Sequence, residues 1–166
     1  MKTLTLLLSI ITLTIANATY ATGASASNAT ASGSGANGAG VVTVRGTNGY
    51  FQYTTSNGNS GDISNVANVD DVNLVYLVAS VSLNTSRYAY CTIYIPSGET
   101  GVATYSVGHS GYGTASATVG NATFSTTCNG SITLSPGSYY LSTSASIGNY
   151  TYGESATIQV VISYDE

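Results

Sequence analysis

The clearest pattern in the chain is a two-residue alternation of apolar and polar side chains. Such alternation predicts a β-strand with one face in the core and the other in solvent. It is cleanest over Tyr88–Ile95, and it recurs over Ala156–Tyr164. In the first segment the apolar face consists of Ala89, Cys91, Ile93 and Ile95.

Other short apolar segments are separated by turn-forming residues such as Asn129-Gly130 and Ser135-Pro136-Gly137. Val72–Leu83 is apolar on both faces, which predicts a central strand. The remaining predicted strands are Val41–Arg45, Tyr50–Thr55, Val102–Val107, Ala115–Val119, Thr123–Cys128, Ser131–Leu134 and Ser138–Ala145. Short strands with turn signals at intervals of about 8–12 residues are typical of an antiparallel, immunoglobulin-like β-sandwich. We therefore expect an all-β sandwich domain over residues 41–166.

Residues 22–40 contain only Ala, Ser, Gly, Thr and Asn. Such a segment buries too little apolar surface to offset the entropy of ordering its backbone. The composition predicts a flexible, extended N-terminal tail before the sandwich.

Residues 1–21 have the pattern of a secretory signal. Lys2 supplies the positive start, an apolar run follows from Leu4 to Ala16, and small residues offer cleavage after Ala18 or Ala21. A membrane-spanning helix needs roughly 20 apolar residues, and this run is shorter. We expect cleavage, an extracellular mature protein and no membrane span in that mature protein.

Charged residues are scarce, at 6% of the chain, against about 25% in ordinary soluble domains. After Lys2 the basic residues are Arg45 and Arg87 alone. This excludes the basic patch that binds nucleic acid. Because acid unfolding acts through paired carboxylates, and the chain has only seven acidic residues, we also expect tolerance of acidic or hot media.

Candidate catalytic groups are few. His109 is the single histidine, and Gly108-His109-Ser110-Gly111 departs from the Gly-x-Ser-x-Gly pattern of serine hydrolases. Carboxylates for glycoside hydrolysis are present but scattered, at Asp62, Asp70, Asp71, Glu99 and Glu154. The sequence predicts neither an enzyme nor a cofactor.

Metal and disulfide chemistry rest on a small set of residues. The Asn- and Asp-rich loop Asn57–Asn73 has the oxygen atoms that calcium prefers but lacks EF-hand spacing. Because Asn and Asp are also ordinary turn formers, calcium there is left open, and no metal site is predicted. Two cysteines in an exported chain predict one disulfide, Cys91–Cys128.

Six Asn-x-Ser/Thr sequons mark acceptors for N-glycosylation. Asn17 lies in the signal segment. Their number alone is weak support, because Asn, Ser and Thr are abundant, but several fall between predicted strands, where a glycan projects into solvent. The expected glycosylation sites are Asn28, Asn84, Asn121, Asn129 and Asn149.

The tail before the sandwich has two interpretations. It is a disordered spacer or glycosylated stalk, or it is a donor strand that completes the sheet of a neighbouring copy by β-augmentation. Ala24 and Ala26 alternate with serine, and the valines that follow are apolar enough to fill a groove. The candidate donor residues are Ala24, Ala26, Val41, Val42 and Val44. The acceptor groove is expected between strands such as Tyr88–Ile95 and Ala156–Tyr164.

This order of signal, small-residue tail, sandwich and sequons resembles the subunits of archaeal thread filaments and, more distantly, the archaeal bundling pilins. The resemblance covers the whole chain as a pattern, without a short diagnostic motif. It implies a pilin-like, N-glycosylated subunit of a cell-surface filament. Such subunits polymerise head to tail with copies of themselves by donor-strand complementation, in support of adhesion or cell contact.

A second hypothesis is a secreted, glycosylated module that binds carbohydrate or associates with a surface layer. Tyr88, Tyr90 and Tyr94 share the polar face of one predicted strand. Aromatic rings on one face can stack against sugar rings. Tyrosine is also simply a frequent strand residue, so this face does not decide between the two functions.

Overall fold

The computed structural model describes residues 23–46, 49–55, 61–62 and 69–164. The predicted signal segment 1–21 lies outside the described residues, as does much of the loop Asn57–Asn73. Side chains of residues 49–55, 61–62, 69–70 and 164 are likewise not described.

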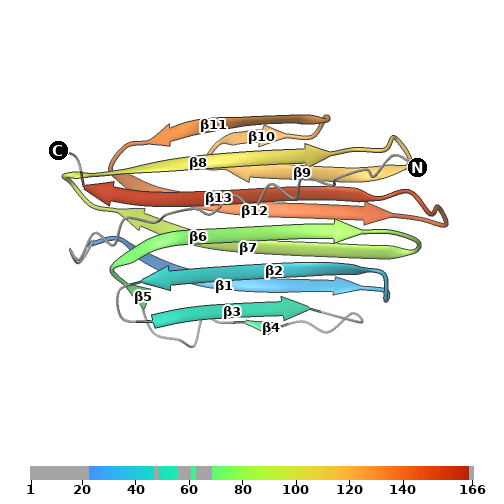
Figure 1. Cartoon of the computed structure of the whole chain (residues 1–166), viewed down its shortest axis with the longest axis horizontal. Coiled ribbons are helices and arrows are strands. Elements are labelled where there is room, and N and C mark those ends of the chain that lie inside the picture. The colour runs from blue at the N-terminus through green and yellow to red at the C-terminus, as the bar shows by residue number, and fades with distance from the viewer. Residues whose placement is uncertain (1–22, 47–48, 56–60, 63–68, 165–166) are drawn as a thin grey trace, which may run out of the picture.

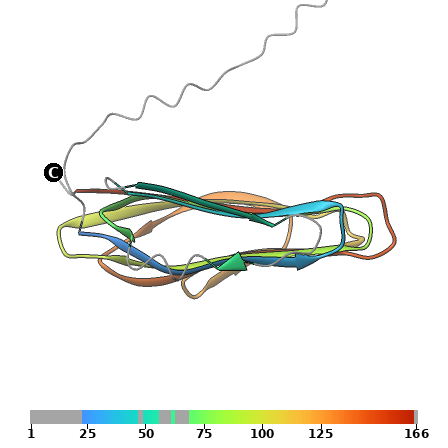
Figure 2. The ribbon, with the colours of Figure 1, turned by 90° about the horizontal axis from the view of Figure 1, so that it is seen from below.

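The described chain forms two antiparallel sheets packed face to face, which Figure 2 shows edge-on as two layers. The predicted all-β sandwich is confirmed. The strands are β1 (Ser25–Ser34), β2 (Gly38–Gly46), β3 (Gly49–Thr55), β4 (Gly61–Asp62), β5 (Val69–Asp70), β6 (Val72–Val81), β7 (Thr85–Ile95), β8 (Glu99–Gly108), β9 (Gly113–Val119), β10 (Ala122–Phe124), β11 (Cys128–Leu134), β12 (Gly137–Ile147) and β13 (Glu154–Tyr164).

Sheet A has the order β10-β9-β12-β7-β1-β4, with β5 also paired to β1. Sheet B has the order β11-β8-β13-β6-β2-β3. Most consecutive long strands lie in opposite sheets, so the chain crosses between the layers at each end of the sandwich (Figure 1). The connections β1–β2, β6–β7, β8–β9 and β12–β13 gather at one end, which we call the Gly35 end. The start of β1 and the β7–β8 turn lie at the other, the Pro96 end.

The core lies between the layers and follows from the alternation in the sequence. On β7, Cys91, Ile93 and Ile95 are buried, whereas Tyr94 is 47% exposed. On β13, Ile158 and Val160 are fully buried, and Val161 between the core positions is 45% exposed. The predicted inward and outward faces of these strands are therefore confirmed.

Two local predictions are wrong. Thr123–Cys128 is not one strand, because β10 ends at Phe124 and the chain bends before β11 begins at Cys128. The segment 22–40, predicted as a flexible tail or a candidate donor strand, is not a flexible tail here, because β1 and the first residues of β2 lie in it. Its backbone is ordered by hydrogen bonding to the sheets, which its composition does not reveal.

The described ranges contain no helix with the length and apolar character needed to cross a membrane.

Candidate functional site around strand β1

Strand β1 opens the described chain and lies near one edge of sheet A. It pairs antiparallel with β7, from Ser25 opposite Tyr94 to Ser34 opposite Ser86. Among the described residues, its other edge pairs with the two-residue strands β4 and β5. Most of its sheet pairing is therefore with the single strand β7.

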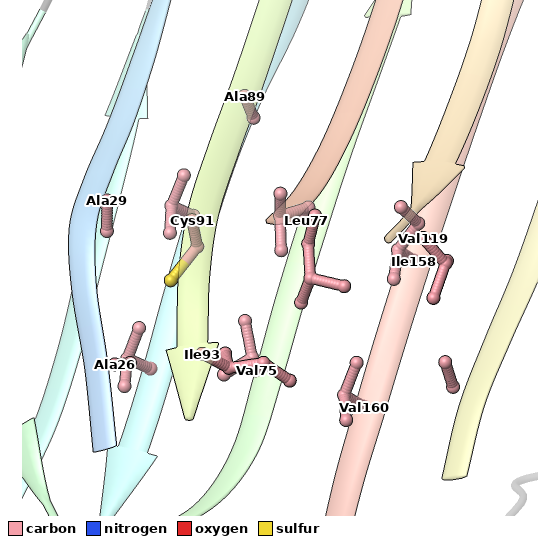
Figure 3. Packing of buried hydrophobic residues seen from close by; sticks show 14 of the residues in the cluster. Ala26, Ala29, Val75, Leu77, Ala89, Cys91, Ile93, Val119, Ile158 and Val160 are labelled. Carbon is pink, nitrogen blue, oxygen red and sulfur yellow. The ribbon is translucent and has the colours of Figure 1, made fainter. Parts of the chain in front are cut away.

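The inward face of β1 is made of alanines. The buried residues at its start and along its length are Ala24, Ala26, Ala29 and Ala31. Figure 3 shows Ala26 and Ala29 beside Cys91 and Ile93 of β7. A methyl group contributes little, since burying one CH₂ is worth about 0.8 kcal/mol. Backbone hydrogen bonds and contacts at the strand ends must therefore hold β1 in place.

A β-bulge interrupts β1 at Asn28. The register with β7 shifts between Ser27 and Thr30, and Asn28 has a positive φ of 53°. Asn adopts this left-handed conformation more readily than most residues. The inserted residue moves the inward alanines from even to odd positions, so both halves of the strand face the core.

At the Gly35 end, Arg87 of β7 holds the end of β1. Its guanidinium donates hydrogen bonds of 2.7 Å from Nη1 to the carbonyl oxygen of Ser34 and from Nη2 to that of Gly35. A third bond runs from Nη1 to the carbonyl oxygen of Ser86. Arg87 is only 1% exposed, and this burial lowers its pKa below the ordinary value. The three carbonyl acceptors offset the cost of burying the charge.

Two glycines make room for this contact. Gly33 lies directly opposite Arg87 in the register, and a Cβ there would lie 2.8 Å from Cδ of Arg87 and closer still to the carbonyl oxygen of Ser86. Gly35 begins the link to β2 with a φ of 81°, which only glycine adopts without strain.

At the Pro96 end, Glu99 of β8 contacts the chain just before β1. Its carboxylate is 1% exposed, and Oε1 accepts a 2.6 Å hydrogen bond from the backbone N–H of Gly23. The next residue, Ala24, accepts a 3.0 Å hydrogen bond from the backbone N–H of Val72. The start of β1 is thus bonded to strands of sheet B.

Of the two segments expected to line an acceptor groove, one pairs with β1 and the other does not. Strand β7 contains Tyr88–Ile95 and pairs with β1. Ala156–Tyr164 lies in β13, whose sheet neighbours are β6 and β8, away from β1. The layer that faces β1 is built instead by β2 and β3. The sheet order, which is non-local, places β13 in the middle of sheet B.

The candidate donor residues divide between the two sheets. Ala24 and Ala26 belong to the buried face at and before the start of β1. The valines at 41, 42 and 44 lie in β2 of sheet B, between β3 and β6. Val42 and Val44 are buried there, and Val41 is half-buried.

The predicted disulfide is not formed in this structure, where Cys91 and Cys128 are both free thiols. Cys91 is buried on β7, inside sheet A, whereas Cys128 begins β11 at the edge of sheet B. Figure 1 shows these two strands well separated across the sandwich. The Cys91 thiol donates a weak hydrogen bond to the carbonyl oxygen of Ser27 in β1, with Sγ 3.6 Å from that oxygen. Burial raises the pKa of this thiol to about 12.

All five predicted glycosylation residues are exposed. Asn28 projects from the bulge in β1, and Asn121 and Asn129 lie in a turn and on an edge strand. Asn84 and Asn149 lie in neighbouring connections at the Gly35 end, with Nδ2 of Asn84 3.5 Å from Oδ1 of Asn149. All five lie at the surface, and their glycosylation stays a prediction.

The outer face of sheet A carries a tyrosine cluster. Tyr88 and Tyr90 have ring centroids 5.4 Å apart, and Tyr90 lies 5.9 Å from Tyr140 of β12. The hydroxyl groups of Tyr88 and Tyr140 are hydrogen bonded to each other. Burial, followed by the contacts with Tyr140, raises the pKa of Tyr88 above its ordinary value. The structure adds Tyr140 to the predicted set and records no ring pairing of Tyr94 with it among the described side chains.

The single histidine is paired with a buried carboxylate. Nδ1 of His109 lies 2.8 Å from Oε2 of Glu154, which is 1% exposed. Glu154 also accepts hydrogen bonds from the Ser110 hydroxyl, from the Ser110 N–H and from the Gly113 N–H. The Ser110 hydroxyl is thus directed at the carboxylate, whereas a nucleophilic serine would donate to its histidine base. These contacts close the β8–β9 loop onto β13.

The described side chains contain no group of three His, Cys, Asp or Glu residues that could hold a metal ion. A shallow depression of about 300 Å³ lies on the outer face of sheet B, lined by Tyr76, Thr104, Tyr105, Ser106, Thr157 and Gln159. It holds no charged or nucleophilic cluster. The candidate functional site is therefore the set of contacts that Arg87 and Glu99 make with the two ends of β1. No protein-family model and no curated protein matches this chain in sequence.

Proposed function

We propose that this protein is a structural subunit of an extracellular filament that polymerises by exchanging strand β1. Each subunit gives its β1 to the next copy and receives β1 from the previous one. The assembly grows head to tail, carries N-linked glycans on its surface and supports adhesion or cell contact. The signal pattern in residues 1–21 supports export.

The observation that carries the proposal is the attachment of β1. It lies at the start of the described chain, pairs mainly with β7, and is joined to the rest of the fold through the three residues Gly35, Ala36 and Asn37. Removal of β1 from its position beside β7 would expose a groove lined by Cys91 and Ile93 of β7. A β1 from a second copy has the same sequence and restores the same contacts, so the exchange costs little at equilibrium.

The link after β1 has the conformational freedom that β1 needs to leave its own subunit. Gly35 accesses a wide range of φ values, so extending residues 35–37 lets β1 move from its own β7 to that of a neighbour. Because donor and acceptor surfaces differ, the contact is heterologous. A heterologous contact that does not close into a ring propagates as a filament.

A cross-link that fixes β1 in its own subunit tests the proposal. The hydroxyl oxygens of Ser34 and Ser86 lie 2.9 Å apart, and the residues are direct partners in the register. The double variant Ser34→Cys/Ser86→Cys places two thiols within disulfide geometry. Oxidised before assembly, it should remain monomeric by negative-stain electron microscopy and light scattering, and it should form filaments after reduction.

The single variants Ser34→Cys and Ser86→Cys are matched controls and should assemble under both conditions. Ser86→Cys also controls for the change in the sequon at Asn84. Normal filaments from the oxidised double variant, with its intramolecular disulfide intact by mass spectrometry, would contradict strand exchange.

The tyrosine cluster on sheet A favours a second candidate, carbohydrate binding. Tyr90 and Tyr140 lie on an outward face beside serine and threonine hydroxyls, with which sugars can hydrogen bond. A glycan array with the monomer tests this function. Specific binding that Tyr140→Ala abolishes supports it, and binding unaffected by Tyr140→Ala removes the cluster from consideration.

A further inference from the structure

We infer that Arg87 and Glu99 are positioning residues that fix the register in which β7 accepts a β1 strand from a second copy of this chain. The inference rests on the proposed function, because it concerns the strand that is exchanged. It adds the residues that decide how far an incoming strand slides before it stops.

The middle of β1 offers little to define its position. Its inward side chains from Ala24 to Ala31 are all methyl groups. Most of its sheet hydrogen bonds go to β7 through backbone atoms, and the two-residue strands β4 and β5 pair with its other edge. A slip of two residues keeps the inward and outward faces and re-forms most backbone bonds. Without further contacts, several registers would have similar free energies.

The two ends of the strand supply the missing contacts. Arg87 bonds the carbonyl oxygens of Ser34 and Gly35, and Glu99 bonds the N–H of Gly23. Both charged side chains are buried, so a register that leaves either without these partners carries a desolvation cost. The hydrogen bonds from Arg87 lie at one end of β1 and the hydrogen bond to Glu99 lies at the other. Together they fix both the position and the length of the inserted strand.

Gly33 adds a steric restriction on the register to the electrostatic cost of leaving Arg87 or Glu99 without partners. Position 33 lies opposite Arg87, where a Cβ would meet the Arg87 side chain and the Ser86 backbone. A two-residue slip in one direction puts Ala31 at this position. The clash and the loss of the Arg87 hydrogen bonds therefore disfavour the same register.

The test uses full-length chains with one introduced cysteine each, so that every cross-link joins two copies. A chain with Ser34→Cys is mixed with a chain with Ser86→Cys, which reports the native register. Mixtures of Ser34→Cys with Tyr88→Cys, and of Ser32→Cys with Ser86→Cys, report slips of two residues in opposite directions. Cys128→Ser is included in every chain, and Cys91 is retained because it is buried.

With native acceptor residues, the first mixture should give the dominant cross-link. In acceptors with Arg87→Met or Glu99→Gln, we expect the ratio of native to shifted cross-links to fall roughly tenfold, since Arg87→Met removes the hydrogen bonds donated by a charged group and Glu99→Gln removes the charge of the acceptor. Val160→Ala, a core change on β13 away from β1, is the matched control for lost stability and should preserve the ratio. An unchanged ratio in both charge variants, with filaments still formed, overturns the inference and leaves the proposed function standing.

Failure of the proposed function looks different. If no mixture cross-links while the chain with Ser34→Cys and Ser86→Cys together does so internally, strands are not exchanged. Hydrogen exchange by mass spectrometry on that monomer then decides whether the two charges hold β1. Roughly tenfold faster exchange confined to the Ser34 end for Arg87→Met, and to the Gly23 end for Glu99→Gln, assigns them as end contacts of the chain's own β1. Exchange no faster than in Val160→Ala overturns the inference altogether.

Discussion

Nδ1 of His109 lies 2.8 Å from Oε2 of Glu154, and this contact joins the β8–β9 loop to the first residue of β13. Burial alone would raise the pKa of Glu154, but the hydrogen bonds from Ser110 and His109 outweigh it, and the net shift is downward. The carboxylate is therefore the form that the fold stabilises.

The pH dependence of stability follows from this shift. An unfolded glutamate has a pKa of about 4.3, and that of folded Glu154 is lower. The contribution of Glu154 is present in full above the unfolded value and is lost as pH falls through the folded value. We expect urea denaturation to give a nearly constant contribution from this site between about pH 5 and 7, and a decrease only in stronger acid.

The variant Glu154→Gln checks this assignment. It should lower the free energy of unfolding at pH 7 by about 1.5–3 kcal/mol, as for hydrogen bonds to a charged group. It should also reduce the slope of the unfolding free energy against pH in acid. Gln159→Ala, on the same strand and without a carboxylate, should keep the wild-type slope. An acid slope unchanged by Glu154→Gln would contradict the role of this carboxylate.

The two cysteines should both be reduced in the folded protein. Alkylation of denatured protein without reductant is expected to add two labels per chain by intact mass, because Cys91 and Cys128 lie in different sheets. A product with no label, which gains two after reduction, would instead show the disulfide.

The buried thiol of Cys91 should report the opening of β1. In a Cys128→Ser background, a thiol reagent should label native protein slowly, because Cys91 is buried next to β1 and its pKa is raised to about 12 by burial. Arg87→Met should accelerate labelling by weakening the end of β1. Native labelling as fast as in urea would show that Cys91 is accessible.

The core between the sheets predicts a sharp contrast along β13. Ile158→Ala removes a fully buried side chain and should cost about 2–5 kcal/mol of unfolding free energy. Val161→Ala removes a side chain that is 45% exposed on the same strand, and its effect should stay within about 0.5 kcal/mol. Equal losses for the two variants would contradict the assigned faces.

Glycopeptide mapping of protein from its native source should find modification at exposed sequon residues and none at exposed asparagines outside a sequon. Asn84 and Asn149 are the informative pair, because their side chains lie within 3.5 Å of each other and two bulky glycans would compete for space. We expect chains that carry a glycan at one of the two to outnumber chains that carry both. Full occupancy of both positions would contradict this crowding.

The sequence predicts the sandwich well where side chains contrast strongly. The alternation of apolar residues and tyrosines over Tyr88–Ile95 fixes which face of β7 is buried, and the structure confirms it. Strand β1 gives a weaker signal, because alanine and serine are close in size and alanine is only weakly apolar. The bulge at Asn28 also divides its alternation into two short stretches.

The contacts at the ends of β1 could be recognised only in part. Arg87 falls in phase with the buried residues Ala89 and Cys91, so alternation alone marks it as an inward-facing charge. Its partners Ser34 and Gly35, more than 50 residues earlier, depend on the order of strands in sheet A. The same non-local strand order separates Cys91 from Cys128 and brings His109 next to Glu154. The spacing of these residues along the chain does not predict that order.

The alanine face of β1 bears on how such a chain can diverge. A strand that inserts only methyl groups carries almost no identity in its middle, so related chains with different outward residues would still fit one another's grooves. The contacts of Arg87 and Glu99 at the two ends of the strand are also made to backbone atoms, so the requirement for glycine at position 33 is the main sequence-dependent feature of the fit. If strands are exchanged as we propose, mixed polymers of sister proteins are expected wherever a glycine at position 33 is shared.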